Sequence, residues 1–469
     1  MKEYKSLTDI QSDISGDKIT LRDLVLHYLG NIEKQASLNA FLEVYGDEAL
    51  QRADLIQDKI KQGRAGKLAG MVIALKDNIC YKGHHVSASS KILQGFESVY
   101  SATVVERLLA EDAIIIGRTN CDEFAMGASN ENSAYGPVHN ALDPERVSGG
   151  SSGGSAVSVQ SDCCLAALGS DTGGSVRQPA AFCGVYGLKP TYGRVSRYGL
   201  IAYASSFDQI GTFTKSVTDS RKLMEVMAGK DPMDATTSEK PVLTQSNVHT
   251  QKKFRISYIR ECIEHEGIDP DVKAATMKLI QELREKGHEV NEISFPYLEY
   301  LVPVYYVLTT AEASSNLSRF SGMLYGHRSD QGHDLDSMIR KSRSEGFGTE
   351  VKRRIMLGTF VLSAGYFDAY YTKAQQVRRL VQDKTEALLR EADFILSPTT
   401  PTAAFKLGEK AGNPIAMYLA DLYTVHANIS GHPALSFPYG SDKNGMPIGM
   451  QLMSDHFNES ALLDFTEVL

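Results

Sequence analysis

The sequence of 469 residues contains no tryptophan, and its six cysteines form no Cys-X-X-Cys pair. That spacing fits neither a zinc site nor a disulfide framework, and it is typical of proteins in a reducing cytoplasm. No run approaches the roughly 18 apolar residues of a membrane span, and residues 1–10 lack the apolar segment of a secretory signal. We therefore expect a cytoplasmic protein that does not cross a membrane.

An excess of positive charge is also missing. The formal net charge is −8 at pH 7, so no general positive field attracts phosphate groups. If nucleic acid takes part in the function, we expect a partner chain to bind it. Hydrophobic residues make up 42% of the sequence, which is enough for a large folded core and excludes general disorder.

Helix-like and strand-like patterns alternate in the first part of the chain. Residues 20–60 carry apolar side chains at helical spacing, and residues 103–110 also look helical. Short apolar runs at residues 71–75 and 113–116 are typical of buried strands. This alternation predicts an α/β fold with parallel strands.

A β-α-β unit is predicted further along the chain. Its strands cover residues 254–259 and 289–295, and the helix between them begins with Asp269 as N-cap and stops at Gly287. The polar stretch at residues 229–253 shows no periodicity and reads as an exposed connection. We expect the unit to extend the same sheet.

Two clusters of glycine and serine, at residues 149–155 and 169–175, stand out in the sequence. Glycines beside serines let backbone N–H groups converge on one point, which suits a phosphate or a tetrahedral oxyanion. A phosphate-binding P-loop is disfavoured, because the lysine that must follow its last glycine is missing. Plain glycine-rich turns and a site for nucleophilic hydrolysis remain open.

The two clusters, together with Lys-Asp-Asn at residues 76–78, resemble the fingerprint of the amidase signature family. The resemblance spans nearly the whole chain. It implies that Ser175 is the nucleophile and that Lys76 is the base. Ser151 is implied to be the serine that bridges them, after a cis peptide bond from Gly150.

This relay agrees with the chemistry of its groups. A serine hydroxyl needs a base to take its proton, and neither cluster contains a histidine. Lysine can act as that base only when neutral, which requires lowering its pKa from about 10.4 toward 7 or 8, a shift worth roughly 3 to 4 kcal/mol. We expect burial at the end of a hydrophobic strand to cause this shift in Lys76.

The second cluster also predicts an oxyanion hole. Its expected donors are the backbone N–H groups of Thr172, Gly173, Gly174 and Ser175. Asp171 and Arg177 flank the nucleophile, and we expect them to orient the loop by pairing. The predicted substrate is therefore an amide that passes through an acyl-enzyme.

Six further stretches resemble the branch of the family that hydrolyses glutamine for tRNA-dependent amidotransferases: residues 122–127, 189–196, 311–317, 344–348, 352–355 and 418–421. In that branch the ammonia passes to a partner, the B subunit, which binds tRNA, uses ATP and Mg²⁺, and converts Glu-tRNA(Gln) to Gln-tRNA(Gln). The complex also contains a small C subunit. The resemblance thus implies that this chain has no cofactor of its own and meets tRNA only through the complex.

Recognition of glutamine needs charged groups of opposite sign for its α-carboxylate and its α-amino group. The resemblance assigns Arg354 to the carboxylate, Asp421 to the ammonium and Tyr305 to a polar contact near them. Without the resemblance, the basic run at residues 352–354 reads as a solvated helix face and Tyr305 as a core residue. His426 stands where the family usually has proline, which affects the expected loop shape near Asp421.

Two rival functions remain open: a free-standing amidase for another small amide, and a non-catalytic protein whose glycine loops hold the phosphate of a nucleotide. We see no boundary that splits the chain. The prediction is a single large α/β domain, the amidase signature fold, with a central mixed sheet covered by helices. Its parts are packing helices at about residues 1–65, the catalytic core at about 66–228, the exposed connection at about 229–253, and the rest of the sheet with the substrate-binding part at about 254–469.

Overall fold

The computed structural model describes residues 1–242, 253–410, 412, 417 and 420–469. Residues 243–252 of the predicted connection and residues 418–419 of one resembling stretch lie outside this part. Within it, eleven strands form one mixed sheet in the order β1-β3-β2-β4-β6-β5-β10-β11-β9-β7-β8. The predicted mixed sheet is thereby confirmed. The strands are β1 Phe41–Val44, β2 Val72–Lys76, β3 Ile114–Thr119, β4 Ala166–Asp171, β5 Tyr186–Lys189, β6 Gln209–Thr214, β7 Arg255–Ile259, β8 Glu289–Ile293, β9 Phe394–Pro398, β10 Ala434–Ser441 and β11 Pro447–Met453.

The sheet consists of two parallel groups joined by antiparallel strands. Strands β3, β2 and β4 are parallel neighbours, and so are β9, β7 and β8. Strands β6, β5, β10 and β11 connect the two groups in antiparallel fashion, and the pairing of β5 with β10 joins the two halves of the chain. Every residue of β2 is buried, as expected for a parallel strand covered on both faces.

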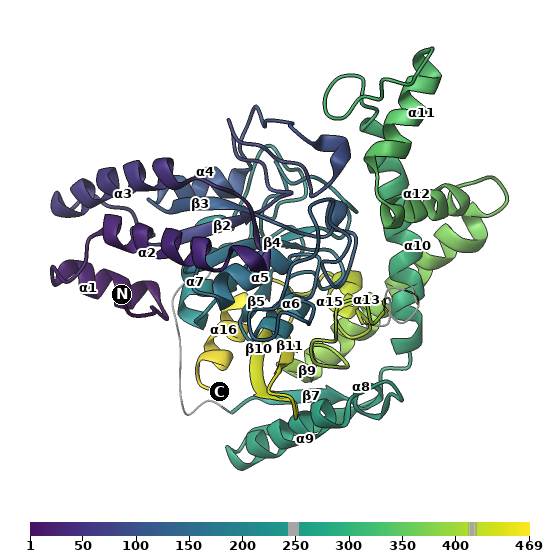
Figure 1. The fold of residues 1–469 in the computed structure, drawn as a ribbon. Coiled ribbons are helices and arrows are strands. Elements are labelled where there is room, and N and C mark those ends of the chain that lie inside the picture. Colours follow the sequence, from purple (N-terminus) through teal and green to yellow (C-terminus); the bar gives the residue numbers. More distant parts are fainter. Residues whose placement is uncertain (243–252, 411, 413–416, 418–419) are drawn as a thin grey trace.

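Helices cover the sheet and extend from it on two sides. In Figure 1, α1, α2 and α3 lie together on one side of the molecule, whereas α10, α11 and α12 form an arm on the other. None of the helices in the described residues combines the length and the apolar character that a membrane span requires. The α-helices are α1 Leu7–Ser15, α2 Leu21–Lys34, α3 Gly46–Lys61, α4 Thr103–Ala110, α5 Gly153–Gln160, α6 Arg177–Cys183, α7 Val217–Met227, α8 Arg260–Glu264, α9 Pro270–Glu285, α10 Leu298–Asn316, α11 Leu335–Gly346, α12 Thr349–Val361, α13 Lys373–Glu391, α15 Val425–Ser430 and α16 Glu459–Glu467. Short helical turns are η1 Ala36–Leu38, η2 Lys91–Leu93, η3 Glu123–Ala125, η4 Leu317–Arg319 and η5 Asp368–Thr372.

Local capping explains where the predicted β-α-β unit begins its helix. Asp269 has an extended backbone and accepts a hydrogen bond from the Asp271 N–H at 2.8 Å, as an N-cap residue does. Strands β7 and β8 on either side of this helix pair in parallel, which confirms the unit. Strand β1 lies within residues 20–60, where helices were expected, and it gives no strand signal because it is only four residues long and partly exposed.

The described part of the predicted connection, residues 229–242, is exposed at most of its positions and is anchored at a few. Asp231 and Asp234 are 4% and 7% exposed. The Ser196 hydroxyl donates to the Asp231 carboxylate, and the Arg197 N–H donates to Asp234 Oδ2 at 2.9 Å. These hydrogen bonds hold the segment against the loop that follows β5.

Candidate active site

Lys76 is the last residue of β2, and its side chain is completely buried. Its Nζ lies 2.7 Å from Ser151 Oγ, 2.9 Å from Ser152 Oγ and 2.9 Å from Ser170 Oγ. Burial lowers the pKa of Lys76 from 10.5 to about 8, against the opposing effect of Cys121 and nearby carboxylates. Near pH 8 the amine is therefore about half neutral, which suits a general base.

Among the described residues, the Ser152 hydroxyl donates to another acceptor, whereas the Ser151 and Ser170 hydroxyls, which also contact this amine, do not. The Ser152 hydroxyl donates to the Ser170 carbonyl oxygen at 3.2 Å. The Ser151 hydroxyl, in contrast, has Lys76 Nζ as its one hydrogen-bond partner among the described residues. The peptide bond between Gly150 and Ser151 is cis, as the resemblance implied. A neutral Lys76 can thus accept the proton of Ser151.

Ser175 lies in the loop between β4 and α6 and is 7% exposed, whereas Lys76 and Ser151 are fully buried. Its carbonyl oxygen accepts a hydrogen bond from the Ser152 N–H at 3.2 Å, which fixes the second glycine-serine cluster against the first. No hydrogen bond links the Ser175 and Ser151 hydroxyls in the described residues, so this step of the relay stays a prediction.

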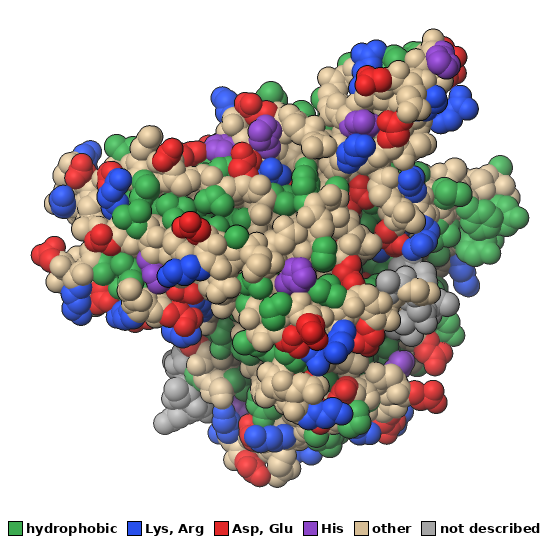
Figure 2. Space-filling model, in the orientation of Figure 1, with side chains coloured by type: hydrophobic (Ala, Val, Ile, Leu, Met, Phe, Trp, Pro, Cys, Tyr) green, Lys and Arg blue, Asp and Glu red, His purple; other side chains and the backbone are tan. Residues whose placement is uncertain are grey.

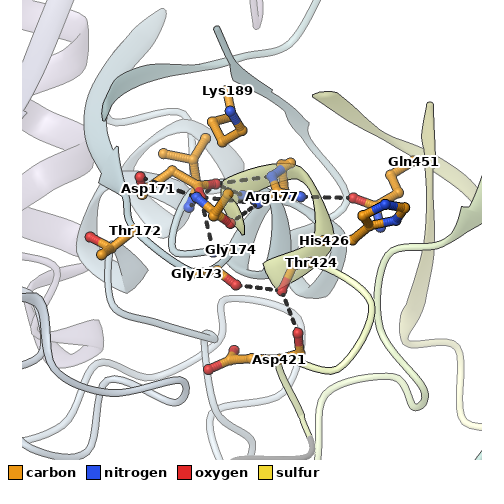
Figure 3. A network of polar contacts seen from close by, with 12 residues as sticks. Asp171, Thr172, Gly173, Gly174, Arg177, Lys189, Asp421, Thr424, His426 and Gln451 are labelled. Carbon is orange, nitrogen blue, oxygen red and sulfur yellow. Dashed lines mark hydrogen bonds and ion pairs between the residues drawn. The ribbon is translucent and has the colours of Figure 1, made fainter. Parts of the chain in front are cut away.

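A buried ion pair anchors the loop that carries Ser175. Arg177 Nε lies 3.1 Å from Asp171 Oδ2, and its Nη2 lies 3.0 Å from Asp171 Oδ1. Arg177 also donates to Gln451 Oε1 at 2.9 Å and to Asn428 Oδ1 at 2.7 Å (Figure 3). Burial alone would raise the pKa of Asp171, but Arg177 lowers it to about 2. The pairing predicted from the sequence is confirmed.

The same carboxylate pairs with one of the expected oxyanion donors. The Gly174 N–H donates to Asp171 Oδ1 at 2.9 Å in this structure. The role of Gly174 in the oxyanion hole therefore stays a prediction. Gly174 has a φ of +130°, and a Cβ at this position would overlap the Thr424 hydroxyl, so only glycine fits. The other expected donors are the backbone N–H groups of Thr172, Gly173 and Ser175.

Arg354 lies on α12 and is turned into the protein, where it is 4% exposed. Its Nε lies 2.9 Å from Glu350 Oε1, one turn earlier on the same helix, and its Nη1 donates to the Tyr203 hydroxyl at 2.9 Å. The guanidinium carbon lies 5.1 Å from the centre of the Tyr306 ring. Residues 352–353 are exposed, so Arg354 alone in this basic run faces inward.

Asp421 and Tyr305 border the glycine loop from the second half of the chain. Asp421 is 7% exposed, and burial raises its pKa to about 8 although Arg354 acts in the opposite direction. The Thr424 hydroxyl lies 2.6 Å from the Gly173 carbonyl oxygen and 3.0 Å from that of Asp421 (Figure 3). Tyr305 packs directly on Gly173, because a Cβ at Gly173 would meet its ring.

Several residues that contact these groups were missed by sequence reasoning: Ser152, Ser170, Tyr203, Tyr306, Glu350 and Thr424. Ser152 and Ser170 belong to the glycine-serine clusters, which could have indicated them. Glu350 precedes Arg354 by four residues, the spacing of an ion pair along one helix face. The sequence carries no local signal for Tyr203, which reaches Arg354 from 151 residues away.

His426 is a core residue in this structure. It is 4% exposed, its Nε2 lies 2.8 Å from Thr385 Oγ1, and its ring centre lies 4.3 Å from that of Phe295. Burial lowers its pKa to about 3, so the ring is neutral at physiological pH. Among the described residues, no group of three or more His, Cys, Asp or Glu side chains is arranged to hold a metal ion.

The chain is similar to known proteins over nearly its whole length. The family model described as Amidase matches residues 23–463. The A subunit of Glutamyl-tRNA(Gln) amidotransferase from Chlorobium luteolum is 51% identical over 465 residues, which are 98% of this chain and 96% of the relative. The crystal structure of the corresponding A subunit from Thermotoga maritima is 39% identical, covers 95% of this chain and 93% of its own, and gives a TM-score of 0.78. A 6-aminohexanoate cyclic dimer hydrolase shares the fold, with 23% identity, a TM-score of 0.86, and coverage of 100% of this chain and 96% of its own. The chain therefore belongs to the amidase family.

Proposed function

We propose that this chain is the glutaminase subunit of a tRNA-dependent amidotransferase, which hydrolyses glutamine and supplies the ammonia for converting Glu-tRNA(Gln) to Gln-tRNA(Gln). The observation that carries the proposal is the buried Lys76 amine, whose lowered pKa and contact with Ser151 suit proton removal beside the Ser175 loop. The relatives that match nearly the whole chain are named as the A subunit of such an enzyme.

The chemistry proceeds through two acyl transfers. Ser175 Oγ attacks the side-chain amide carbon of glutamine while its proton passes through the Ser151 hydroxyl to neutral Lys76. The backbone N–H groups at Thr172, Gly173 and Ser175 stabilise the oxyanion. Lys76 returns the proton to the leaving nitrogen, which departs as ammonia and leaves a glutamyl ester on Ser175. Water then hydrolyses this ester to glutamate by the same proton path.

Glutamine is oriented by charges from the second half of the chain. Arg354 holds the α-carboxylate, because its rigid guanidinium is already fixed by Glu350 and Tyr203. Asp421 holds the α-ammonium, and Tyr305 completes the pocket next to Gly173. The positive substrate group lowers the pKa of the Asp421 carboxyl and favours its ionised form.

A surface on α12 and the segment after it supports the existence of a partner. Residues 356–372 contain a single charged side chain, Asp368. Phe360, Tyr366 and Tyr370 are 42%, 45% and 43% exposed. In Figure 2, hydrophobic side chains gather at the right edge of the molecule, on the side where Figure 1 shows α12. Exposed aromatic patches of this kind mark protein interfaces. We propose that this patch docks a partner protein of the amidotransferase near the site of ammonia release.

The proposed division of work within the complex agrees with the charge of this chain. Figure 2 shows Lys, Arg, Asp and Glu side chains interspersed over this face rather than a broad basic surface. We therefore propose that the B subunit holds tRNA and that it also uses ATP and Mg²⁺. The proposed complex includes a small C subunit and works in the cytoplasm.

The test is to co-express the chain with the B and C subunits of its own organism, and to measure ammonia released from glutamine and Gln-tRNA(Gln) formed. Both products are expected from the complex. Rapid hydrolysis of varied amides by the chain alone, with glutamine among the poor substrates, would favour a free-standing amidase. Tight ATP binding to the chain without amide turnover would favour the nucleotide-binding alternative.

A further inference from the structure

Glu123 is a buried carboxylate that the proposed mechanism does not use. It lies in the short turn η3 and is 3% exposed. The Gly348 N–H donates to both of its oxygens, at 3.1 Å and 2.9 Å, and the Ser90 hydroxyl donates to Oε1. A carboxylate held in this way by two other segments of the chain fixes their relative positions.

One of those segments is the start of α12. Gly348 is the N-cap residue of this helix. As a glycine it has no side chain that could accept a hydrogen bond from the first turn. The Glu123 carboxylate therefore supplies the acceptor and the negative charge that a helix N-terminus favours. A Cβ at Gly348 would overlap Glu123 Oε2, so a larger residue here would displace the carboxylate. The capped helix carries Arg354 within its second turn.

The residue before Glu123 contacts the bridging serine. The backbone N–H of Asp122, the residue before Glu123, donates to the Ser151 carbonyl oxygen at 3.0 Å. The Asp122 carboxylate accepts from the Asn130 N–H at 2.9 Å and from the Asn132 N–H at 3.0 Å. Two consecutive residues thus contact the bridging serine on one side and the arginine-bearing helix on the other.

We propose that Glu123 is a positioning residue for glutamine: by capping α12 from the turn that holds Ser151, it sets Arg354 at the distance from which the substrate amide meets Ser175. This inference rests on the proposed function, since it takes glutamine as the ligand. Glu123 acts through Gly348 and α12 and does not touch the substrate.

Ionisation of Glu123 matters to this role, because a protonated carboxyl cannot accept at both oxygens. Burial raises its pKa to about 7, against the lowering effect of Ser90, the Gly348 N–H and Lys352. The carboxylate lines a cavity of about 350 Å³ between the turn and α12. The other titratable groups around this cavity are Lys91, Glu131, Glu345 and Glu350.

The test is an equilibrium measurement in a Ser175→Ala background, so that turnover does not intervene. Calorimetry with glutamine is carried out on the complex that contains the B and C subunits, with and without Glu123→Gln. At pH 8 the amide variant should bind glutamine about tenfold more weakly, because it loses a charge and a hydrogen bond at the helix N-terminus. Near pH 6 the two affinities should converge, because Glu123 is then protonated in the parent as well. Titration of Asp421 affects both proteins equally, so it cancels when their glutamine affinities are compared as a ratio.

Glu345→Gln is the matched control. Glu345 borders the same cavity but accepts hydrogen bonds from Ser329 and His327 instead of from α12. This variant should bind glutamine as the parent does at every pH. The decisive quantity is the dissociation constant of glutamine in Glu123→Gln divided by that in the parent. A ratio that stays at about one, or that stays at about ten from pH 6 to 8, would overturn the inference.

A second variant keeps the inference testable if Glu123→Gln does not fold. Gly348→Ala disturbs the same contact from the helix side, because its Cβ meets the carboxylate. Gly348→Ala should therefore also weaken glutamine binding, and an unchanged affinity in this variant would contradict the inference. If the parent fails to bind glutamine at all while wild-type protein hydrolyses another amide, the proposed function itself is wrong.

Discussion

The rate of glutamine hydrolysis should depend on pH through Lys76, because only its neutral amine can accept the proton of Ser151. Burial lowers the pKa of Lys76 from 10.5 to about 8. The turnover number should therefore rise about tenfold per pH unit below pH 8 and level off near about pH 9. The measurement needs saturating glutamine, whose ammonium group, while it is itself protonated, favours the ionised form of Asp421.

The magnitude follows from the fraction of neutral amine. At pH 7, a lysine with a pKa of 10.5 is neutral in roughly one molecule in 3,000, whereas a pKa of about 8 leaves roughly one in eleven neutral. The difference between 10.5 and 8 is about 2.5 units, which corresponds to about a 300-fold larger population of the base and to about 3 kcal/mol. Burial of the strand end thus accounts for most of the activation of this lysine.

Ammonia release would be recorded from about pH 6 to about pH 9.5 for the wild type, Lys76→Ala and Lys189→Met. Lys189 is the matched control, because burial lowers its pKa as well, to about 7, while its Nζ donates to the backbone carbonyl of Pro190 at 2.9 Å. Lys76→Ala should be inactive at every pH, and the Lys189 variant should keep the wild-type profile. A flat wild-type profile, or residual near-normal turnover in Lys76→Ala, would refute the reasoning.

Three further variants probe the anchor, the substrate site and the partner surface. Arg177→Met should lower the free energy of unfolding by about 3 to 5 kcal/mol, since it leaves the Asp171 carboxylate buried without its partner. Chemical denaturation measures this free energy, and a loss below about 1 kcal/mol would contradict the prediction. Arg354→Ala should raise KM for glutamine at least tenfold in steady-state kinetics, while circular dichroism shows an unchanged fold. An unchanged KM would show that Arg354 does not belong to the glutamine site. Phe360→Asp should abolish co-purification of the B and C subunits without changing Tm, whereas Leu55→Asp, 67% exposed on α3, should leave the complex intact.

The sequence predicts features that depend on neighbouring residues. The buried run that ends at Lys76 and the capping by Asp269 are local patterns, and both strand β2 and helix α9 form where these patterns place them. The ion pair of Asp171 with Arg177 is also local, because the two residues are only 6 positions apart in the sequence. Residues of this kind could be assigned before any coordinates were known.

Other features depend on contacts between distant segments or on the orientation of a single amide. The Gly174 N–H donates to the Asp171 carboxylate, which composition cannot reveal. Tyr203 meets Arg354, and Glu123 meets Gly348 225 residues later, through the packing of loops around the sheet. Such pairings require the strand order to be known, and the sequence specifies that order only through many weak long-range contacts.

The meeting of two halves of the chain across β5 and β10 has a consequence for how such enzymes diversify. The proposed proton relay comes from residues before 178, and the groups assigned to glutamine come from residues after 300. Mutations on α10 or α12 can therefore exchange one amide for another during evolution and leave the hydrolytic apparatus intact. A duplicated gene inherits working chemistry and needs only a new pocket.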